Sequence, residues 1–192
     1  MIIGFTGRMA AGKGFITEHL QSRGFHRFSL SDEVREEAKK REIPFEREKL
    51  QFLGNELRMK YGDGVLAKRT LQKLENLEGD FVIEGIRNPA EIKELKKHGE
   101  FFLIALDAPR KLRYQRFVSK KRENIDPMTW EEFLIVDDRD FGKGQDKSGQ
   151  NTGKCMELAD FSLFNDSDEG SFSEKINEIL EQITLRLGEE QS

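Results

Sequence analysis

Short apolar runs alternate with stretches of helical periodicity along the chain. The apolar runs lie at residues 1–5 (MIIGF), 25–30 (FHRFSL), 80–86 (DFVIEGI), 100–109 (EFFLIALDAP) and 160–164 (DFSLF). Runs of this length, bounded by glycine, proline or charged residues, are typical of buried strands. Because strands that alternate with helices build parallel sheets, the pattern predicts an α/β fold with helices on both faces of a parallel sheet.

Helix signals occupy the segments between these runs. The first helix is expected after residue 13, with Gly24 at its end. Helical patterns at 46–61 and 63–77 predict two more. Other helices are predicted to start at Ser31, which is followed by Asp32 and Glu33, and at Asn88, which is followed by Pro89. The capping boxes Thr129/Glu132 and Ser171/Glu174 predict two further helix starts.

Two segments depart from the alternation. Residues 31–77 are helical in pattern throughout, which predicts an insertion beside the sheet. Residues 123–151 are rich in Gly, Asp and Lys, and apart from a short helix they are expected to be loop. The GKG at 142–144 and the GQNTGK at 149–154 follow no apolar strand, so we interpret both as mobile loop rather than as phosphate-binding motifs.

Composition excludes several classes of function. The 192 residues suit one domain, and a net charge of −4 without a basic patch argues against binding to a nucleic acid polymer. The single cysteine, Cys155, cannot form an internal disulfide, and the three scattered histidines do not suggest zinc. With no long apolar run or signal peptide, we expect a cytoplasmic protein that does not bind a membrane.

The first candidate functional motif directly follows the first apolar run. It is Gly-x-x-x-x-Gly-Lys, from Gly7 to Lys13. A loop that leads from a strand into a helix presents backbone N–H groups to one point, where the helix dipole adds positive potential. Lys13 would reach the outer phosphates of a nucleotide. The general motif continues with Ser or Thr as a magnesium ligand, but this chain has Gly14 and then Phe15.

A kinase also needs an acceptor site, and two arginine motifs suit a phosphate acceptor. Arg35 follows the second apolar run, and Arg87 stands three residues after Glu84 at the end of the third. Arginine binds phosphate through two parallel hydrogen bonds and stays charged. Alternatively, Arg35 is a solvated member of a charged helix, and Glu84 and Arg87 simply pair with each other.

The chain as a whole resembles the nucleoside monophosphate kinases of the adenylate-kinase-like class, in which GKG is followed by Thr. It is most similar to deoxynucleoside monophosphate kinase-like proteins and archaeal adenylate-kinase-related proteins, through SDEVR, LGNELR, YGDGVLA and VIEGIR. The resemblance covers roughly residues 1–187. It implies a three-layer P-loop fold with a five-stranded parallel sheet, a nucleoside-monophosphate-binding insertion at 31–77 and a lid at 120–151.

The resemblance also implies roles for residues. Catalytic roles fall on Lys13, Arg87, Arg116 and Arg139, and Glu84 is expected to hold Mg²⁺ through water. Binding of ATP is assigned to Gly7, Arg8, Met9, Ala10, Ala11, Gly12, Lys13, Gly14, Phe15, Arg116 and Asn165. Binding of the acceptor is assigned to Ser31, Asp32, Arg35, Asn55, Arg58, Glu84 and Arg87.

Three functions remain open at this point. The first is transfer of a phosphoryl group from ATP, with Mg²⁺, to a nucleoside or deoxynucleoside monophosphate. The second is phosphorylation of a ribose hydroxyl, as in dephospho-CoA kinase, with Asp32 as the base. The third is a nucleotide-binding regulator with little turnover. The expected partners are small-molecule nucleotides, and the chain is expected to act as a monomer or homodimer.

Overall fold

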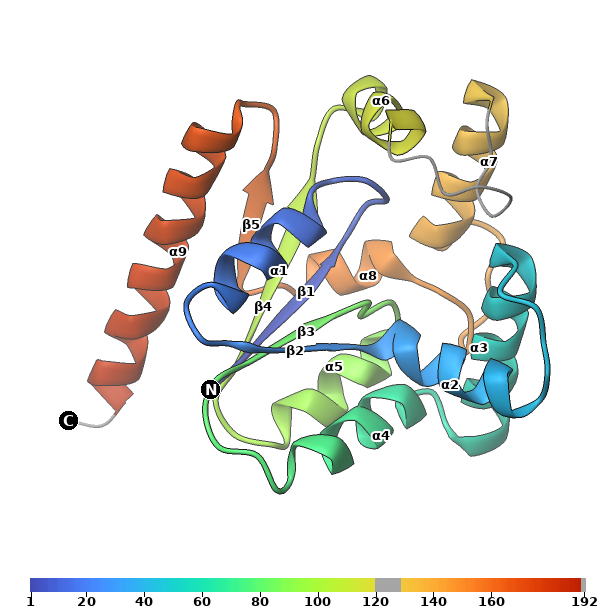
Figure 1. Cartoon of the computed structure of the whole chain (residues 1–192), viewed down its shortest axis with the longest axis horizontal. Coiled ribbons are helices and arrows are strands. Elements are labelled where there is room, and N and C mark those ends of the chain that lie inside the picture. The colour runs from blue at the N-terminus through green and yellow to red at the C-terminus, as the bar shows by residue number, and fades with distance from the viewer. Residues whose placement is uncertain (120–128, 191–192) are drawn as a thin grey trace.

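A five-stranded parallel sheet forms the centre of the molecule (Figure 1). The computed structural model describes residues 1–119 and 129–190. Its strands run in the order β2-β3-β1-β4-β5, and all neighbouring strands pair in parallel. Their bounds are β1 Ile2–Gly7, β2 His26–Ser29, β3 Phe81–Glu84, β4 Phe101–Asp107 and β5 Phe161–Phe164. The three-layer P-loop fold predicted from the sequence is confirmed.

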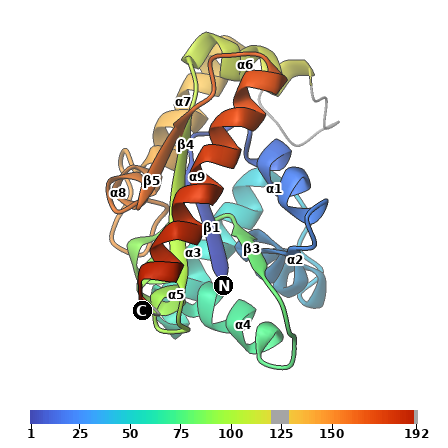
Figure 2. The same ribbon diagram turned by 90° about the vertical axis from the view of Figure 1, so that its left-hand side faces the viewer.

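Helices cover both faces of the sheet, as Figure 2 shows for α1 on one side and α5 and α8 on the other. The bounds are α1 Lys13–Gln21, α2 Leu30–Lys40, α3 Arg47–Tyr61, α4 Val65–Leu74, α5 Pro89–Lys96, α6 Arg110–Ser119, α7 Trp130–Phe141, α8 Thr152–Glu157 and α9 Glu169–Glu190. Among the described residues, no helix is both long enough and apolar enough to cross a membrane.

The period-two alternation of the strands divides the interior into two cores. Ile2 and Leu103 face one core, which α2, α4 and α5 also build. Their neighbours Ile3 and Phe102 face the other, which α1 and α9 cover. Because successive strand residues point to opposite faces, a continuous apolar run is what a sheet buried on both sides requires.

Capping chemistry fixes two helices near the site. The Asn88 side chain accepts a hydrogen bond from the backbone N–H of Ala90, and the Glu91 side chain accepts one from the backbone N–H of Asn88. Thr129 and Glu132 form the same reciprocal pair at the start of α7. Both caps were predicted from the sequence, and together they fix where α5 and α7 begin.

Three helix predictions need correction. Helix α2 begins at Leu30 after an extended Ser29, so Ser31 lies inside the helix instead of capping it. Asp168 accepts from the N–H groups of Gly170 and Ser171, so it takes the capping role predicted for Ser171. Part of the predicted loop at 149–154 belongs to α8, since Asn151 caps that helix and the helix packs on β1 and β4.

The predicted lid is described only in part. Residues 120–128 lie outside the described residues, and the remainder consists of α7 and the segment that leads to α8. Trp130 packs edge-on against Tyr114 and stacks on Phe133, which confirms the packing role predicted for it. Helix α7 is thereby attached to α6 through aromatic rings.

Candidate functional site

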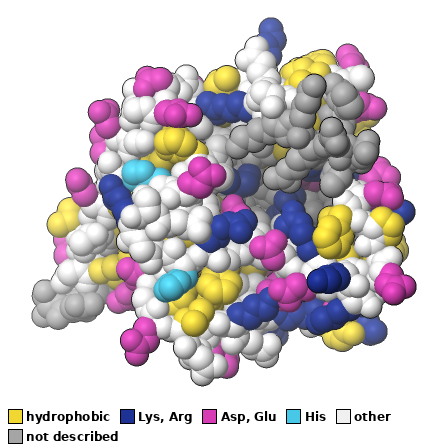
Figure 3. Space-filling model, viewed as in Figure 1, with side chains coloured by type: hydrophobic (Ala, Val, Ile, Leu, Met, Phe, Trp, Pro, Cys, Tyr) yellow, Lys and Arg dark blue, Asp and Glu magenta, His cyan; other side chains and the backbone are white. Residues whose placement is uncertain are grey.

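A cavity of about 870 Å³ opens at the carboxyl ends of the strands, which is where open α/β sheets bind their ligands. It is lined by the loop after β1, by residues that follow β3 and β5, and by parts of α6 and α7. Lys and Arg side chains gather round the hollow in the middle of this face (Figure 3). The nine consecutive residues predicted as the ATP loop, 7–15, all line the cavity.

Backbone geometry explains the glycines of this loop. Gly7 and Gly12 have φ values of 136° and 112°, in the left-handed region that favours glycine. A β-carbon on Gly7 would overlap the carbonyl oxygen of Leu106, and one on Gly12 would overlap the Asn165 amide. Gly14 differs, because a β-carbon there would meet no described atom within 4 Å. Packing therefore does not explain the missing Ser or Thr at position 14.

Lys13 lies across the mouth of the loop. Its ammonium donates to the carbonyl oxygens of Gly7 and Arg8, at 2.7 and 2.6 Å. Burial and, after it, the nearby Arg87 guanidinium lower the pKa of Lys13 to about 7, although Asp140 and Glu84 oppose the shift. The positive charge of the ammonium is thus poorly neutralised by the protein itself, and an anion bound at the loop would stabilise it.

Asn165 and Arg116 connect the last strand to the loop. The Asn165 amide donates to the carbonyl of Ala11 at 3.0 Å, and its own oxygens accept from Arg116 at 3.1 and 3.2 Å. Asn165 is buried, and both residues line the cavity. Both side chains therefore lie beside the phosphate loop, and their predicted role in binding ATP stays a prediction.

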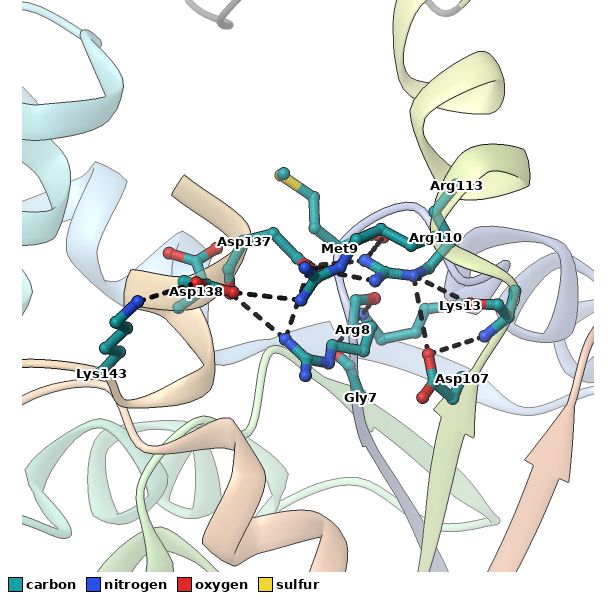
Figure 4. Close-up of polar contacts among 12 residues, drawn as sticks. Gly7, Arg8, Met9, Lys13, Asp107, Arg110, Arg113, Asp137, Asp138 and Lys143 are labelled. Atoms are coloured by element: carbon teal, nitrogen blue, oxygen red, sulfur yellow. Dashed lines mark hydrogen bonds and ion pairs between the residues drawn. The ribbon is translucent and has the colours of Figure 1, made fainter. Parts of the chain in front are cut away.

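A buried carboxylate on α7 holds three arginines beside the loop (Figure 4). Asp137 binds Arg113 through both oxygens, at 2.6 and 3.0 Å, and contacts Arg8 at 3.3 Å and Arg110 at 3.5 Å. Arg113 also donates to the carbonyl of Met9 at 3.1 Å. Arg110 also pairs with Asp138 at 3.0 Å and Arg113 with Asp107 at 3.5 Å, so three carboxylates balance the three guanidinium groups beside the phosphate loop.

Arg87 lies where the large cavity meets a second cavity of about 140 Å³, and it lines both. Its guanidinium contacts Asp140 at 3.3 Å and Gln150 at 3.1 Å. Burial lowers the pKa of Arg87, and Asp140 counteracts this shift. Glu84 contacts Arg27 instead, so in the described structure Glu84 and Arg87 do not pair with each other.

A buried ion pair positions the backbone of Arg87. Arg58 donates to one oxygen of Glu91 at 2.8 and 2.9 Å, and both side chains are almost fully buried. The other Glu91 oxygen accepts from the N–H groups of Arg87 and Asn88. Arg58 lines the smaller cavity, yet its main contact holds α3 on α5, so it acts as a positioning residue for Arg87.

The remaining predicted acceptor residues divide into two groups. Ser31 and Arg35 line the smaller cavity, with Arg35 paired to Asp32 at 2.7 Å. Among the described residues, Asp32, Asn55 and Arg139 line neither cavity. Arg139, which was expected to stabilise charge on the transferred phosphoryl group, contacts Glu48 at 3.8 Å instead.

Oxygen ligands for a cation are few at this site. Phe15 packs against the ring of Phe172, and the Thr17 hydroxyl donates to the carbonyl of Lys13 at 3.0 Å and to a Glu84 oxygen at 3.4 Å. Within 1–119 and 129–190, no group of three or more His, Cys, Asp or Glu side chains could hold a metal. Thr17 and Glu84 are therefore the side chains that fit an ion also bound by nucleotide phosphates.

Sequence comparison identifies the family. An AAA domain family pattern matches residues 3–133. The UPF0200 protein of Pyrococcus horikoshii is 34% identical over 189 residues, which cover 95% of this chain and 97% of that protein. The chain belongs to the UPF0200 family. The family pattern and the site geometry agree on a P-loop kinase-like nucleotide-binding domain.

Solved structures share the fold of this UPF0200 chain. A shikimate kinase from Bacteroides thetaiotaomicron superposes with a TM-score of 0.55 at 13% identity, covering 96% of this chain and 98% of the kinase. A gluconokinase from Sinorhizobium meliloti gives 0.54 at 13% identity, covering 98% and 94%. At such identity the likeness concerns the fold alone.

The lowered pKa of Lys13 predicts proton uptake on nucleotide binding. At pH 8 a lysine of pKa about 7 is about nine-tenths neutral, and an anionic phosphate favours its charged form. We therefore expect ADP binding at pH 8 to take up close to one proton, and at pH 6 to take up none at Lys13. Calorimetry in buffers of different ionisation enthalpy measures this number. Lys13→Met should abolish the uptake, and equal uptake in that variant would contradict the assignment.

Sequence reasoning missed several residues of the site. The missed side chains are Arg27, Arg47, Gln51, Asp137, Asp140 and Gln150. The acids had one signal, because Asp137 and Asp140 are three residues apart and thus share one face of α7. The polar residues of α3 had none, since an exposed helix face has the same composition.

Proposed function

We propose that this protein transfers the terminal phosphoryl group of ATP to a nucleoside or deoxynucleoside monophosphate. The position of Arg87 carries the proposal, because its guanidinium lines both the cavity of the phosphate loop and the smaller cavity beside it. Arg35, Arg47 and Arg58 also line the smaller cavity. A pocket with this excess of arginine suits a phosphorylated acceptor.

The reaction follows from these positions. The loop amides and Lys13 bind the outer phosphates of the donor. An oxygen of the acceptor phosphate forms a bond to the γ-phosphorus as the bond from that phosphorus to the β–γ bridging oxygen breaks, and ADP leaves. No proton needs to be removed, since the acceptor phosphate is already ionised. Arg87 neutralises the acceptor, and Arg8 and Arg116, which line the larger cavity, stabilise the charge that develops.

Magnesium fits the donor side of this scheme. When bound, Mg²⁺ would neutralise the β- and γ-phosphate oxygens of ATP. Thr17 and Glu84 are the side chains that would contact the ion or its waters, because both line the cavity beside Lys13. Arg27 contacts the same Glu84 carboxylate.

The hydroxyl-acceptor alternative needs a base, and Asp32 suits this role poorly. Its side chain is 44% exposed, is paired to Arg35 at 2.7 Å, and lies outside the described lining of both cavities. A general base must lie within hydrogen-bond reach of the proton that it removes. The position of Asp32 therefore favours a phosphate acceptor, which needs no base.

A panel of acceptors tests the proposal. The protein is incubated with ATP, Mg²⁺ and one acceptor at a time, and ADP formation is followed. The acceptors are each nucleoside and deoxynucleoside monophosphate, dephospho-CoA, shikimate and gluconate. We expect turnover well above ATP hydrolysis with at least one monophosphate. Turnover with dephospho-CoA, shikimate or gluconate alone would contradict the proposal, and binding of ATP without turnover on any acceptor would favour a regulator.

Replacing Arg87 should damage acceptor use specifically. We expect Arg87→Ala to raise the KM for the monophosphate by about 10- to 100-fold, because a charge-assisted hydrogen-bonded contact is lost, while the KM for ATP changes little. The matched control is Arg41→Ala, which removes an arginine of the 31–77 insertion that, in the described structure, pairs with Glu37 and Glu56 and lines neither cavity. An unchanged acceptor KM in Arg87→Ala would show that the acceptor site is wrongly placed.

A further inference from the structure

Asp140 lies at the junction of the two cavities and lines both. One of its oxygens accepts from Arg47 at 2.7 Å and Arg87 at 3.3 Å, and the other accepts from Gln51 at 2.8 Å. The residue is buried, with 7% of its surface exposed. A helix that covers the site thus places a carboxylate on the same guanidinium groups that face the acceptor pocket.

These donors are arranged as they would be for a phosphate. Two guanidinium groups and one amide converge on a single anionic group, and arginine forks match the oxygens of carboxylate and phosphate alike. Gln150 completes the arrangement, since its carbonyl oxygen accepts from both Arg87 and Gln51 at 3.1 Å. The donor set therefore accommodates an oxyanion and does not depend on that oxyanion being Asp140.

We propose that Arg47 and Arg87 form the seat of the acceptor's phosphate group and that the Asp140 carboxylate occupies this seat until the phosphate displaces it. The inference rests on the proposed function and deepens it. Two anions cannot share these donors at close range, so binding of the acceptor moves Asp140 away. The acceptor class that follows is a phosphate monoester, whose two negative charges outcompete one carboxylate, whereas an uncharged hydroxyl compound does not displace Asp140.

The seat is tested by phosphate binding, independently of turnover. Protein saturated with ADP, which fills the phosphate loop, is titrated calorimetrically with inorganic phosphate. We expect Asp140→Asn to bind phosphate about tenfold more tightly than the unaltered protein, and Arg47→Gln about tenfold more weakly. The matched control is Asp138→Asn, which removes the same charge from the same helix but from a side chain paired with Arg110 and Lys143. It should change the affinity by less than about twofold.

Two binding results would overturn the seat. One is an affinity in Asp140→Asn no higher than that in Asp138→Asn, and the other is an unchanged affinity in Arg47→Gln. Thermal melts with ADP establish that each variant is folded. If Asp140→Asn does not fold, Arg47→Gln and the charge-conserving Arg47→Lys carry the test. Phosphate should bind more weakly to Arg47→Gln, and Arg47→Lys should recover part of the lost affinity, because the charge at position 47 binds the phosphate.

Kinetics separate this inference from the proposed function. With a monophosphate acceptor, Asp140→Asn should lower the acceptor KM and keep kcat. A large loss of kcat at unchanged KM, with a hydroxyl acceptor as substrate, would make Asp140 a general base and overturn the inference. If no monophosphate is phosphorylated but the phosphate titrations follow the expected order, the seat stands and the proposed function fails.

Discussion

Glu91→Ala is expected to lower the free energy of unfolding by about 3–5 kcal/mol, because it strands the buried charge of Arg58. The variant also removes the acceptor of two backbone N–H groups at the start of α5. For a chain of this size the loss corresponds to a fall in Tm of about 10 °C. Urea unfolding followed by circular dichroism measures it.

Two further variants isolate the cause. Glu94→Ala removes a glutamate from the same helix that pairs with the exposed Lys97, so it should cost less than about 1 kcal/mol. The double variant Arg58→Met with Glu91→Gln keeps a capping oxygen and leaves no charge, so it should lose less stability than Glu91→Ala. If Glu91→Ala unfolds like Glu94→Ala, the buried pair does not stabilise the fold.

Lys13→Met is expected to reduce kcat/KM for phosphoryl transfer by about 10³-fold, because under the proposed function it removes the ammonium that stabilises charge on the transferred group. Coupled measurement of ADP formation with the preferred acceptor reports the loss. Lys97→Met, an exposed lysine paired only with Glu94 in the described structure, should leave the rate unchanged. A Lys13→Met variant with more than about a tenth of the original activity would be inconsistent with this role.

Stability distinguishes this loss of activity from misfolding. The pKa of Lys13 is lowered from 10.5 to about 7, so between these pH values the unfolded chain binds more protons than the folded one. The free energy of unfolding therefore rises with pH across this window. Below it, the buried ammonium destabilises the fold. Lys13→Met should consequently be at least as stable as the unaltered protein, with a flatter pH dependence of stability above pH 7.

Local sequence signals were sufficient for most of the fold. Apolar runs located all the strands of the sheet, and the caps at Asn88 and Thr129 placed two helix starts, because these features depend on neighbouring residues alone. The predictions of helix starts were wrong where two residues a few positions apart could each begin the helix. Ser31 and Ser171 both have the right chemistry for a cap, but α2 begins at Leu30 and α9 at Glu169, so both serines lie within the first turn of their helix.

The two sides of the site differed in how far sequence could predict them. The loop at 7–15 is contiguous and joins a strand to a helix, so its position at the cavity followed from its order in the chain. The acceptor side comes from separate elements. Arg35 and Arg58 were identified from the sequence, but their pairing with Asp32 and Glu91 was not, since a helical arginine has several acids within reach.

The sequence by itself determined the parallel sheet, the phosphate loop and the presence of arginine at the ends of β3 and α6, because chain order and strand–helix alternation dictate these features. Only the tertiary structure decided which carboxylates meet those arginines. Asp137 lies 129 residues from Arg8, and Asp140 lies 53 residues from Arg87. In the sequence both acids belong to an ordinary charged helix. They become part of the site because aromatic packing holds α7 over the cavity, and no local pattern encodes that contact.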